Sequence, residues 1–321
     1  MTHVSHWVYP KETLIRHHMP VGAKRAWIRK DGHMFFDGFA LARIDVSDNV
    51  SLRVRIGGTG PAVVLLHGHP RTHTTWHHVA PRLAAAGFTV VCPDLRGYGQ
   101  STGPVPDPEH RQYSDRAMAQ DIAQLMTSLG HQSFSVVGHD RGSYVAYRTA
   151  LDHADRVERL AVFDCVPILE ALERADARFA EEGWHWFFFA TEHAERVICA
   201  DPLAWYRPEA ARIGQENYAD MVAAITDPET VRAMLEDYRA GLHVDRAADE
   251  ADRAAGRTIG CPTLVAWSIH DDMETLYGDP AAIWRPWVSG ELRTARIDSG
   301  HHMAEDNPAQ LTAELTAFLS T

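Results

Sequence analysis

The chain has 321 residues, of which 45% are hydrophobic and 23% charged, with a formal net charge of −12. This composition is typical of a globular protein with a sizeable core. The negative charge argues against nucleic acid and anionic membranes as partners, because both select basic surfaces, so we expect a small molecule and water instead.

The first residues of the chain lack the basic and apolar regions of a secretory signal. No apolar run reaches the ~20 residues that cross a bilayer. Four cysteines are widely spaced without a Cys-x-x-Cys pair: Cys92, Cys165, Cys199 and Cys261. This spacing favours reduced, mostly buried thiols over a disulfide framework or a zinc site, and it makes a cytoplasmic location the expected one. The sequence leaves open whether the protein forms a homodimer.

Apolar runs and helical patterns alternate along the chain. Polar and apolar residues alternate over residues 51–56, which predicts a half-buried strand. The clearest helix spans residues 114–129, with Ser114 suited to cap its start and Gly130 its end, and a second helix is predicted over 308–319. Runs that are apolar on both faces, typical of central parallel strands, cover residues 62–66, 89–92, 134–137, 160–163 and 263–267.

This alternation predicts an α/β fold with a mostly parallel sheet, helices on both faces, and a ligand site beyond the C-terminal strand ends. Over residues 167–256 the strand-like runs stop, and Ala, Arg, Glu and aromatic residues recur at helical spacing. We interpret this segment as a helical cap inserted between two core segments, 46–166 and 257–321. Residues 1–45 form an N-terminal extension that we expect to lie on the surface.

The most informative motif is Gly138-His-Asp-Arg-Gly142, which joins a predicted strand to a predicted helix. Glycines two positions before and after Asp140 permit a sharp turn that lifts the central side chain clear of the backbone. This pattern is typical of a nucleophile elbow. A carboxylate in that place displaces a leaving group from saturated carbon better than it attacks an amide. The motif therefore predicts opening of a carbon–halogen bond or an epoxide through an ester of Asp140.

Hydrolysis of such an ester needs a base that activates water. His301 follows a strand-like run over residues 293–297 and comes directly after a glycine, and the neighbouring His302 is the alternative. Two carboxylates compete to orient the imidazole, because Asp164 and Asp271 each follow a predicted strand. From the order of groups along the chain alone, Asp271 is slightly favoured.

The segment His67-Gly-His-Pro70 follows the strand predicted over residues 62–66. A backbone N–H of this loop can join that of Arg141 in an oxyanion site, which places His69 in the pocket wall. Histidines 67, 69, 73, 77 and 78 straddle a strand end, a loop and a helix start without an acidic partner. We therefore expect no metal and no cofactor.

Together these motifs resemble those of the fluoroacetate dehalogenases, the haloacetate dehalogenase branch of the α/β-hydrolases. The resemblance covers residues 50–320. It rests on His67-Gly-His-Pro-Arg-Thr-His-Thr-Thr-Trp76, Asp94-Leu-Arg-Gly-Tyr-Gly-Gln-Ser101, Gly138-His-Asp-Arg-Gly142, Phe163-Asp-Cys-Val-Pro167, Trp184-His-Trp186, Glu236-Asp-Tyr-Arg-Ala-Gly241 and Ser299-Gly-His301. It implies an α/β-hydrolase fold with an inserted helical cap and the hydrolysis of small 2-halocarboxylic acids to 2-hydroxy acids.

Residue by residue, the resemblance implies Asp140 as the nucleophile and His301 as the base. It also favours Asp164 over Asp271 as the acid that orients the histidine.

In the cap, the resemblance implies that His185, Trp186 and Tyr238 donate hydrogen bonds to the departing halide. Neutral donors in a dry pocket can stabilise that developing charge. The alternative for these residues is plain aromatic packing within the cap.

The family holds the substrate carboxylate between two arginines, one directly after the nucleophile and one three positions further on. Arg141 occupies the first position, whereas the second is Tyr144, which offers one neutral hydrogen bond. Loss of a charged partner costs about 1.5–3 kcal/mol of carboxylate binding. Arg71 is the candidate replacement, with a surface-facing side chain as the alternative. His69 changes the same wall, because the family more often carries an aromatic residue there.

Two other functions remain open from the sequence. An epoxide hydrolase uses the same aspartate, histidine and acid but needs cap tyrosines to protonate the opening oxygen, and Tyr206, Tyr218 and Tyr238 are candidates. The third interpretation is a small-molecule binding protein without turnover. The complete set of catalytic candidates argues against it, because the chain keeps Asp140, His301 and two acids.

Overall fold

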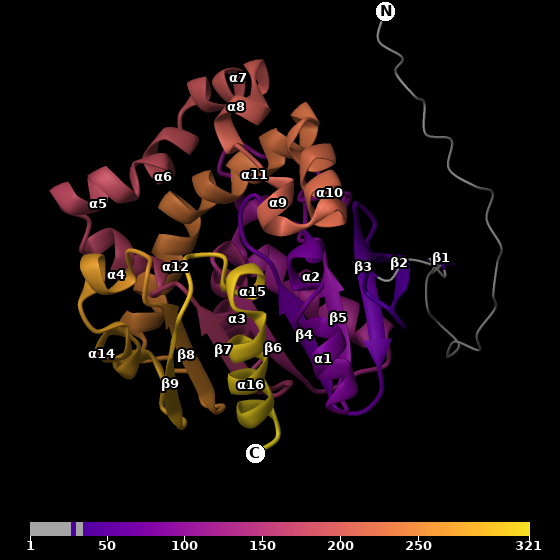
Figure 1. The fold of residues 1–321 in the computed structure, drawn as a ribbon. Helices are drawn as coiled ribbons and strands as arrows, with labels where there is room; N and C mark the ends of the chain where they lie inside the picture. The colour runs from indigo at the N-terminus through magenta and orange to yellow at the C-terminus, as the bar shows by residue number, and fades with distance from the viewer. Residues whose placement is uncertain (1–26, 30–34) are drawn as a thin grey trace, which may run out of the picture.

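The computed structural model describes residues 27–29 and 35–321. Within this part of the chain, nine strands form one sheet in the order β1-β2-β3-β5-β4-β6-β7-β8-β9 (Figure 1). The strands from β1 to β5 along this order pair antiparallel, and those from β5 to β9 pair parallel. Their bounds are β1 Trp27–Arg29, β2 Ala40–Ser47, β3 Val50–Gly58, β4 Ala62–Leu66, β5 Thr89–Pro93, β6 Phe134–His139, β7 Val157–Phe163, β8 Thr263–Ser268 and β9 Leu292–Ile297.

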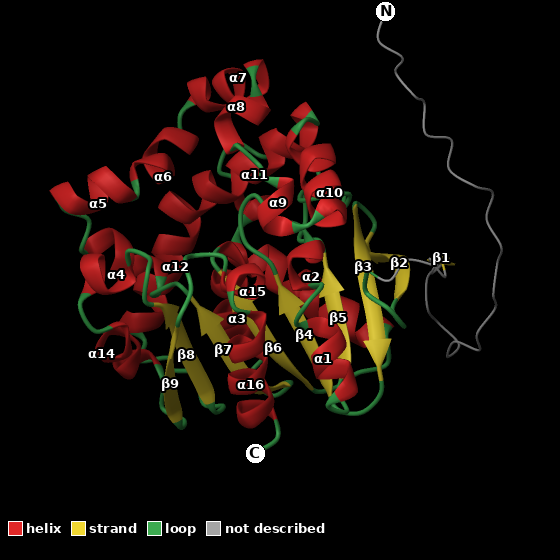
Figure 2. Ribbon diagram, in the orientation of Figure 1, coloured by secondary structure: helices red, strands yellow, loops and turns green. Residues whose placement is uncertain are grey.

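The helices cover both faces and one end of this sheet (Figure 2). The α-helices are α1 Ala80–Ala85, α2 Asp115–Ser128, α3 Arg141–Asp152, α4 Ile168–Glu173, α5 Ala177–Glu182, α6 Trp184–Phe189, α7 Glu192–Ala200, α8 Pro202–Tyr206, α9 Ala210–Ile213, α10 Gln215–Ile225, α11 Pro228–Ala240, α12 Arg246–Ala254, α13 Met273–Tyr277, α14 Pro280–Trp284, α15 Met303–Asp306 and α16 Pro308–Leu319. The 3₁₀-helices are η1 His73–Trp76, η2 Arg111–Tyr113 and η4 Arg285–Trp287, and η3 Gly241–Asp245 is a π-helix.

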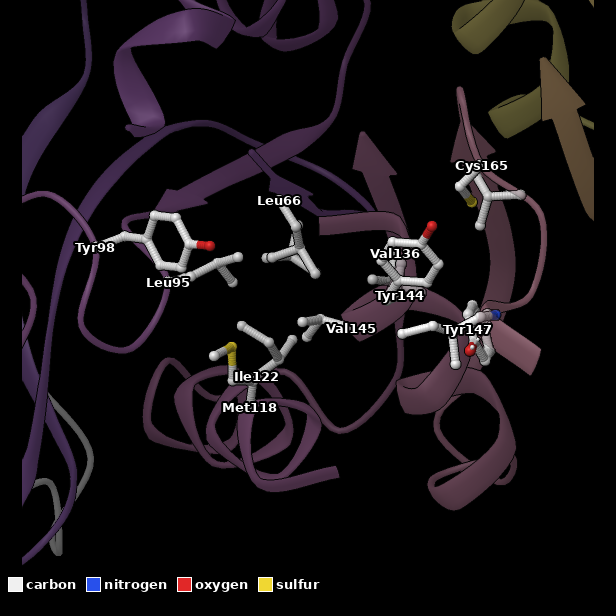
Figure 3. Close-up of a cluster of buried hydrophobic side chains, with 14 of the residues drawn as sticks. Leu66, Leu95, Tyr98, Met118, Ile122, Val136, Tyr144, Val145, Tyr147 and Cys165 are labelled. Atoms are coloured by element: carbon white, nitrogen blue, oxygen red, sulfur yellow. Dashed lines mark hydrogen bonds between the residues drawn. The ribbon is translucent and has the colours of Figure 1, made fainter. Parts of the chain in front are cut away.

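The central strands are buried on both faces, as their continuous apolar sequences predict. Along β4, Val64 and Leu66 belong to one hydrophobic cluster, and Val63 and Leu65 belong to another. This alternation arises because successive strand side chains point to opposite faces of the sheet. Figure 3 shows the first cluster, in which strand residues meet side chains of α2 and α3. The α/β fold predicted from the sequence is confirmed.

Helix α2 illustrates how local sequence sets element ends. The Ser114 hydroxyl accepts a hydrogen bond from the backbone N–H of Ala117 at 3.2 Å, so it caps the helix as predicted. Gly130, just past the end, has a φ of 87°, a left-handed conformation that glycine adopts at little cost. None of the helices in the described part of the chain is long and apolar enough to cross a membrane.

Between β7 and β8 the chain forms a series of helices, α4 to α12 and η3, which we call the cap, followed by an isolated β-bridge at Ile259. In Figure 1 the cap lies at the end of the sheet toward which the parallel strands point. It therefore covers the C-terminal strand ends, where ligands bind in open α/β sheets.

The N-terminal boundary at residue 45 differs from the structure, because β2 spans Ala40–Ser47 and crosses it. β2 pairs antiparallel with β3, and Ala42 and Ile44 are buried in the core. The expectation that residues up to 45 only lie on the surface is therefore wrong for this strand. The rest of that prediction, over residues 1–26 and 30–34, falls outside the described residues.

Candidate active site

Asp140 occupies a strained turn between the end of β6 and the start of α3. Its φ of 52° and ψ of −122° lie outside the regions that L-residues ordinarily adopt. A Cβ atom at Gly138 would lie 2.2 Å from the carbonyl oxygen of Gly142, and one at Gly142 would lie 2.4 Å from that of Leu66. Both glycines are therefore required by close backbone approach, and the turn has the geometry of a nucleophile elbow.

The loop after β4 supports the Asp140 carboxylate. The backbone N–H of His69 donates to Asp140 Oδ1 at 2.6 Å. The backbone N–H of Arg141 also favours the ionised carboxylate. Gly68 makes this approach possible, because a Cβ there would lie 2.3 Å from Asp140 Oδ1. These two N–H groups form the arrangement that stabilises an oxyanion on the carboxyl carbon.

His301, on the loop after β9, faces Asp140. Its Nε2 lies 3.7 Å from Asp140 Oδ2, and its Nδ1 is hydrogen-bonded to Asp271 Oδ2 at 2.7 Å. Burial by itself would lower the pKa of His301, but the carboxylates of Asp140 and Asp271 raise it well above its ordinary value. Burial likewise opposes ionisation of Asp140, yet its contact with His301 holds the pKa of Asp140 well below its ordinary range.

The direct partner of His301 is thus Asp271 rather than Asp164, the acid that the family resemblance favours. Asp164 Oδ2 lies 3.7 Å from the same Nδ1. Both oxygens of Asp164 are already occupied, because Ser268 donates to them from its backbone N–H at 2.8 Å and its hydroxyl at 2.7 Å. In this arrangement Asp271 orients the ring, and Asp164 adds negative charge behind it.

A cavity of about 340 Å³ opens between the elbow and the cap. His185, Trp186 and Tyr238 all line it, together with Asp140 and His301. The ring centroid of Tyr238 lies 6.1 Å from that of His185 and 6.3 Å from that of Trp186. The three predicted halide donors therefore share one side of the cavity. Their ring contacts show that they also pack against one another.

The structure does not place Arg141 as the family resemblance implies. Its guanidinium is almost fully buried and is paired through Nε and Nη2 with both carboxylate oxygens of Asp237 in α11. Its guanidinium carbon lies 4.8 Å from the ring centroids of both Tyr144 and Tyr238. Both rings line the cavity, whereas Arg141 is not among the lining residues.

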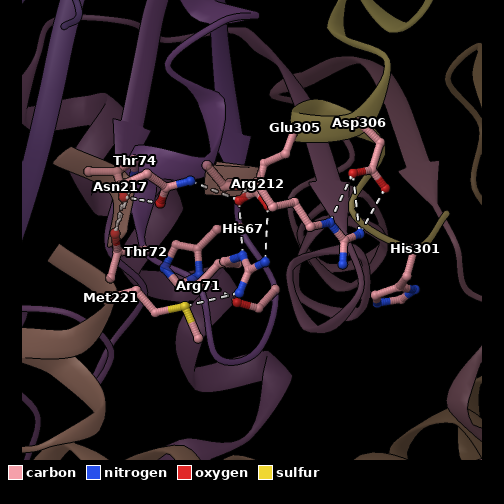
Figure 4. A network of polar contacts seen from close by, with 12 residues as sticks. His67, Arg71, Thr72, Thr74, Arg212, Asn217, Met221, His301, Glu305 and Asp306 are labelled. Atoms are coloured by element: carbon pink, nitrogen blue, oxygen red, sulfur yellow. Dashed lines mark hydrogen bonds and ion pairs between the residues drawn. The ribbon is translucent and has the colours of Figure 1, made fainter. Parts of the chain in front are cut away.

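Arg71 is likewise absent from the cavity lining, and it is not surface-facing either. It is buried and donates from Nε and Nη2 to the two carboxylate oxygens of Glu305, at 2.9 and 3.0 Å (Figure 4). Both interpretations of Arg71 from the sequence are wrong, because its guanidinium forms a buried ion pair with a carboxylate 234 residues away in sequence.

Two predicted wall residues do line the cavity, namely His69 and Tyr144. The His69 ring lies among aromatic rings of the cap, with centroid distances of 5.2 Å to both Phe189 and Tyr238. Burial is the main cause that lowers the pKa of His69, to about 3, so this ring is neutral. Both of its ring nitrogens are buried without a hydrogen-bond partner among the described residues.

Sequence reasoning missed several residues that shape the site. Asp237 and Ser268 hold Arg141 and Asp164, while Glu182 and Asp272 line the cavity. Burial, followed by the charge of Asp271, raises the pKa of Asp272 to about 6. Asp237 does stand inside the cap motif quoted above, but its pairing with Arg141 cannot be inferred from a single sequence.

Two groups of His and Asp side chains bring potential metal-ligand atoms together in the described residues. In the group His73, Asp94 and Asp220, the cationic Arg53 Nη1 lies 2.7 Å from Asp220 and 3.5 Å from Asp94. The guanidinium of Arg53 therefore already compensates the negative charge of these carboxylates.

The second group comprises His139, Asp164 and His301. Here His139 Nε2 is hydrogen-bonded to the carbonyl oxygen of His301 at 2.6 Å, and Asp164 is held by Ser268. A metal at this point would have to break these hydrogen bonds and the one between His301 and Asp271.

A family model described as the alpha/beta hydrolase fold matches residues 61–308. The chain belongs to the α/β-hydrolases. A fluoroacetate dehalogenase of Burkholderia sp. is 38% identical over 295 residues, which are 89% of this chain and 95% of that protein. The family and the resemblance to dehalogenases inferred from the motifs are thus confirmed.

Other α/β-hydrolases are also similar to the chain. Epoxide hydrolase A of Mycobacterium tuberculosis is 29% identical over 325 residues, covering 88% of this chain and 98% of that protein. The solved structure of ALR0039 from Nostoc sp. PCC 7120 superposes with a TM-score of 0.84 at 36% identity, covering 89% of this chain and 99% of that one. Both dehalogenases and epoxide hydrolases therefore stand among its relatives.

The elbow glycines give a test of the local geometry. We expect Gly138→Ala to lower the free energy of unfolding by about 3 kcal/mol or more, because its Cβ would overlap the backbone of Gly142. The matched control is Gly260→Ala, which has no atom within 4 Å of its added Cβ and should change stability little. Urea unfolding followed by circular dichroism measures both variants, and equal midpoints would contradict the assigned geometry.

The coupling between His301 and Asp140 gives a second test. Asp140→Asn removes a negative charge that raises the pKa of His301, so we expect the ring to titrate at a lower pH in this variant than in the wild type. Proton NMR of the imidazole signal over a pH series measures the midpoint. Asp298→Asn, whose carboxylate contacts the exposed His270 instead, serves as the control and should leave His301 unchanged.

Proposed function

We propose that this protein hydrolyses a carbon–halogen bond of a small organic molecule through an ester of Asp140. The observation that carries this proposal is the placement of Asp140. The carboxylate stands in a strained elbow, receives a backbone N–H from the His69 loop, and opens on a cavity that also holds His301 and Tyr238. A carboxylate held in this way is a nucleophile for saturated carbon.

In the first half-reaction, an oxygen of Asp140 attacks the carbon that bears the halogen. A carbon–oxygen bond forms as the carbon–halogen bond breaks, and the halide leaves with the bonding electron pair. His185, Trp186 and Tyr238 line the cavity as neutral donors for the departing halide. Burial lowers the pKa of His185, so its ring stays neutral and donates without carrying charge.

In the second half-reaction, water attacks the carbonyl carbon of the ester, and His301 removes its proton. The N–H groups of His69 and Arg141 stabilise the resulting oxyanion, and collapse of the intermediate releases an alcohol and restores the Asp140 carboxylate. The net reaction consumes one water and yields the alcohol, the halide and one proton.

Charge coupling gives His301 the right protonation state for each step. In the resting site the negative charge of Asp140 raises the pKa of His301, so the ring is charged and keeps Asp140 ionised. Ester formation removes the charge of Asp140, and this lowers the pKa of His301. The ring then releases its proton and can act as a base on water.

Similarity supports the same chemistry, because the Burkholderia relative at 38% identity is a fluoroacetate dehalogenase. Epoxide opening is the second candidate, favoured by the phenol of Tyr238, which lines the cavity and can protonate an opening oxygen. Of the other cap tyrosines, Tyr206 and Tyr218 pack against the hydrophobic core and are not among the lining residues. Because only one of these three cap tyrosines lines the cavity, we rank dehalogenation first.

The ester mechanism has a direct test. We expect His301→Gln to stop the second half-reaction, lowering turnover by a factor of about 100 or more, and to accumulate an adduct on Asp140. Intact mass spectrometry after incubation with haloacetates, haloacetamides and 2-chloropropionate detects it. His270→Gln, whose exposed side chain lies outside the cavity lining, is the control and should show no adduct. Absence of an adduct with every substrate that the wild type converts would rule out the ester.

A substrate panel separates the two reactions. We expect the wild-type protein to release halide from at least one of the haloacetates, haloacetamides and 2-chloropropionate, and to leave styrene oxide unopened. Tyr238→Phe removes one donor to the leaving halide and should slow halide release by a factor of about ten or more. Opening of styrene oxide at a higher kcat/KM than any halogenated substrate, measured side by side, would favour the epoxide hydrolase.

A further inference from the structure

The charge inside the cavity limits which substrate can enter it. Five carboxylates line the cavity, and none of its lining residues is lysine or arginine. The five are Asp140, Asp164, Glu182, Asp271 and Asp272.

The histidines of the cavity add little positive charge. Burial lowers the pKa of His69, His185 and His302, so all three rings are neutral. His301 is charged, but its two ring nitrogens face the carboxylates of Asp140 and Asp271, which together outweigh its positive charge. The lining therefore carries a net negative charge before any substrate binds.

Arg141, the nearest arginine to Asp140 along the chain, does not offset the net negative charge of the lining. Two of its nitrogens bind Asp237, and Asp115 lies 3.9 Å from Nη2. Its remaining nitrogen, Nη1, is buried without a hydrogen-bond partner among the described residues. A substrate carboxylate at Nη1 would thus meet a guanidinium whose charge is already neutralised by Asp237.

A carboxylate that enters this cavity loses its hydration and meets like charges at short range in a poorly screening environment. An uncharged amide or hydroxyl group pays a smaller cost for lost hydration and meets no repulsion between like charges. Neutral hydrogen-bonding groups are available to it, because His69 presents two unpartnered ring nitrogens and Tyr144 lines the cavity where the family carries its second arginine.

We infer that the site selects an uncharged halogenated substrate, with an amide or hydroxyl group at the end away from the halogen, and discriminates against halocarboxylates. This inference rests on the proposed function and narrows its substrate class. It distinguishes this protein from a haloacetate dehalogenase by the charge around the nucleophile rather than by the reaction.

The test compares two substrates that differ only in charge. Fluoroacetamide and fluoroacetate, and the corresponding chloro compounds, are incubated with the full-length wild-type protein, and halide release is followed over a range of substrate concentrations. We expect kcat/KM for each amide to exceed that for its acid by at least about tenfold.

Two variants locate the origin of this preference. Tyr144→Arg adds a cation to the wall and should shift the ratio of kcat/KM, acid over amide, upward by about tenfold or more. Tyr144→Phe is the matched control, since it keeps the ring and adds no charge, and it should leave the acid as the poorer substrate. Thermal unfolding of both variants checks that they are folded, and the wild-type comparison stands without them.

The outcomes separate the inference from the function on which it rests. Halide release from the acids at a rate equal to or above that from the amides overturns the inference and leaves the dehalogenase intact. Absence of both halide and Asp140 adduct with acids and amides alike overturns the proposed function as well. Release from the amides with the expected ratio supports both.

Discussion

The buried ion pair between Arg141 and Asp237 holds the two halves of the site together. Arg141 directly follows Asp140, and Asp237 directly precedes Tyr238 in α11, so three hydrogen bonds between Arg141 and Asp237 tie the elbow to the cap. Removal of either partner would leave an uncompensated buried charge, which costs about 3–5 kcal/mol. The position of the cavity wall over Asp140 therefore depends on this contact, and the same contact holds the guanidinium of Arg141 away from the cavity lining.

A second coupling runs through His301, whose ring lies between Asp140 and Asp271. The charge of Asp140 raises the pKa of His301, so in the proposed mechanism formation of the ester at Asp140 lowers that pKa and prepares the ring to act as a base. Asp164, held rigidly by Ser268, contributes negative charge at a fixed place. The order of steps in the proposed mechanism thus follows from the electrostatics of these four side chains.

Much of this site is predictable from sequence, for reasons that are local. The glycines around Asp140 enforce a turn, and the apolar runs before Asp140 and Asp271 place both carboxylates at the same sheet edge. The partners of Arg141 and Arg71 were not predictable, because each pairs with an acid far away along the chain. Chain order slightly favours Asp271, which the structure pairs with His301, whereas the family resemblance favours Asp164, whose two oxygens Ser268 occupies.

The pair between Arg71 and Glu305 has a mechanical consequence. Arg71 stands two residues after His69, and Glu305 stands four residues after His301, so the bidentate contact joins the loop of His69 to the loop of His301. Because the Nε and Nη2 contacts fix both distance and angle, the two loops are constrained to shift as one body. A displacement of either loop would carry the His301 ring and the backbone N–H of His69 together, so the proposed mechanism would keep both groups aligned on the ester carbon.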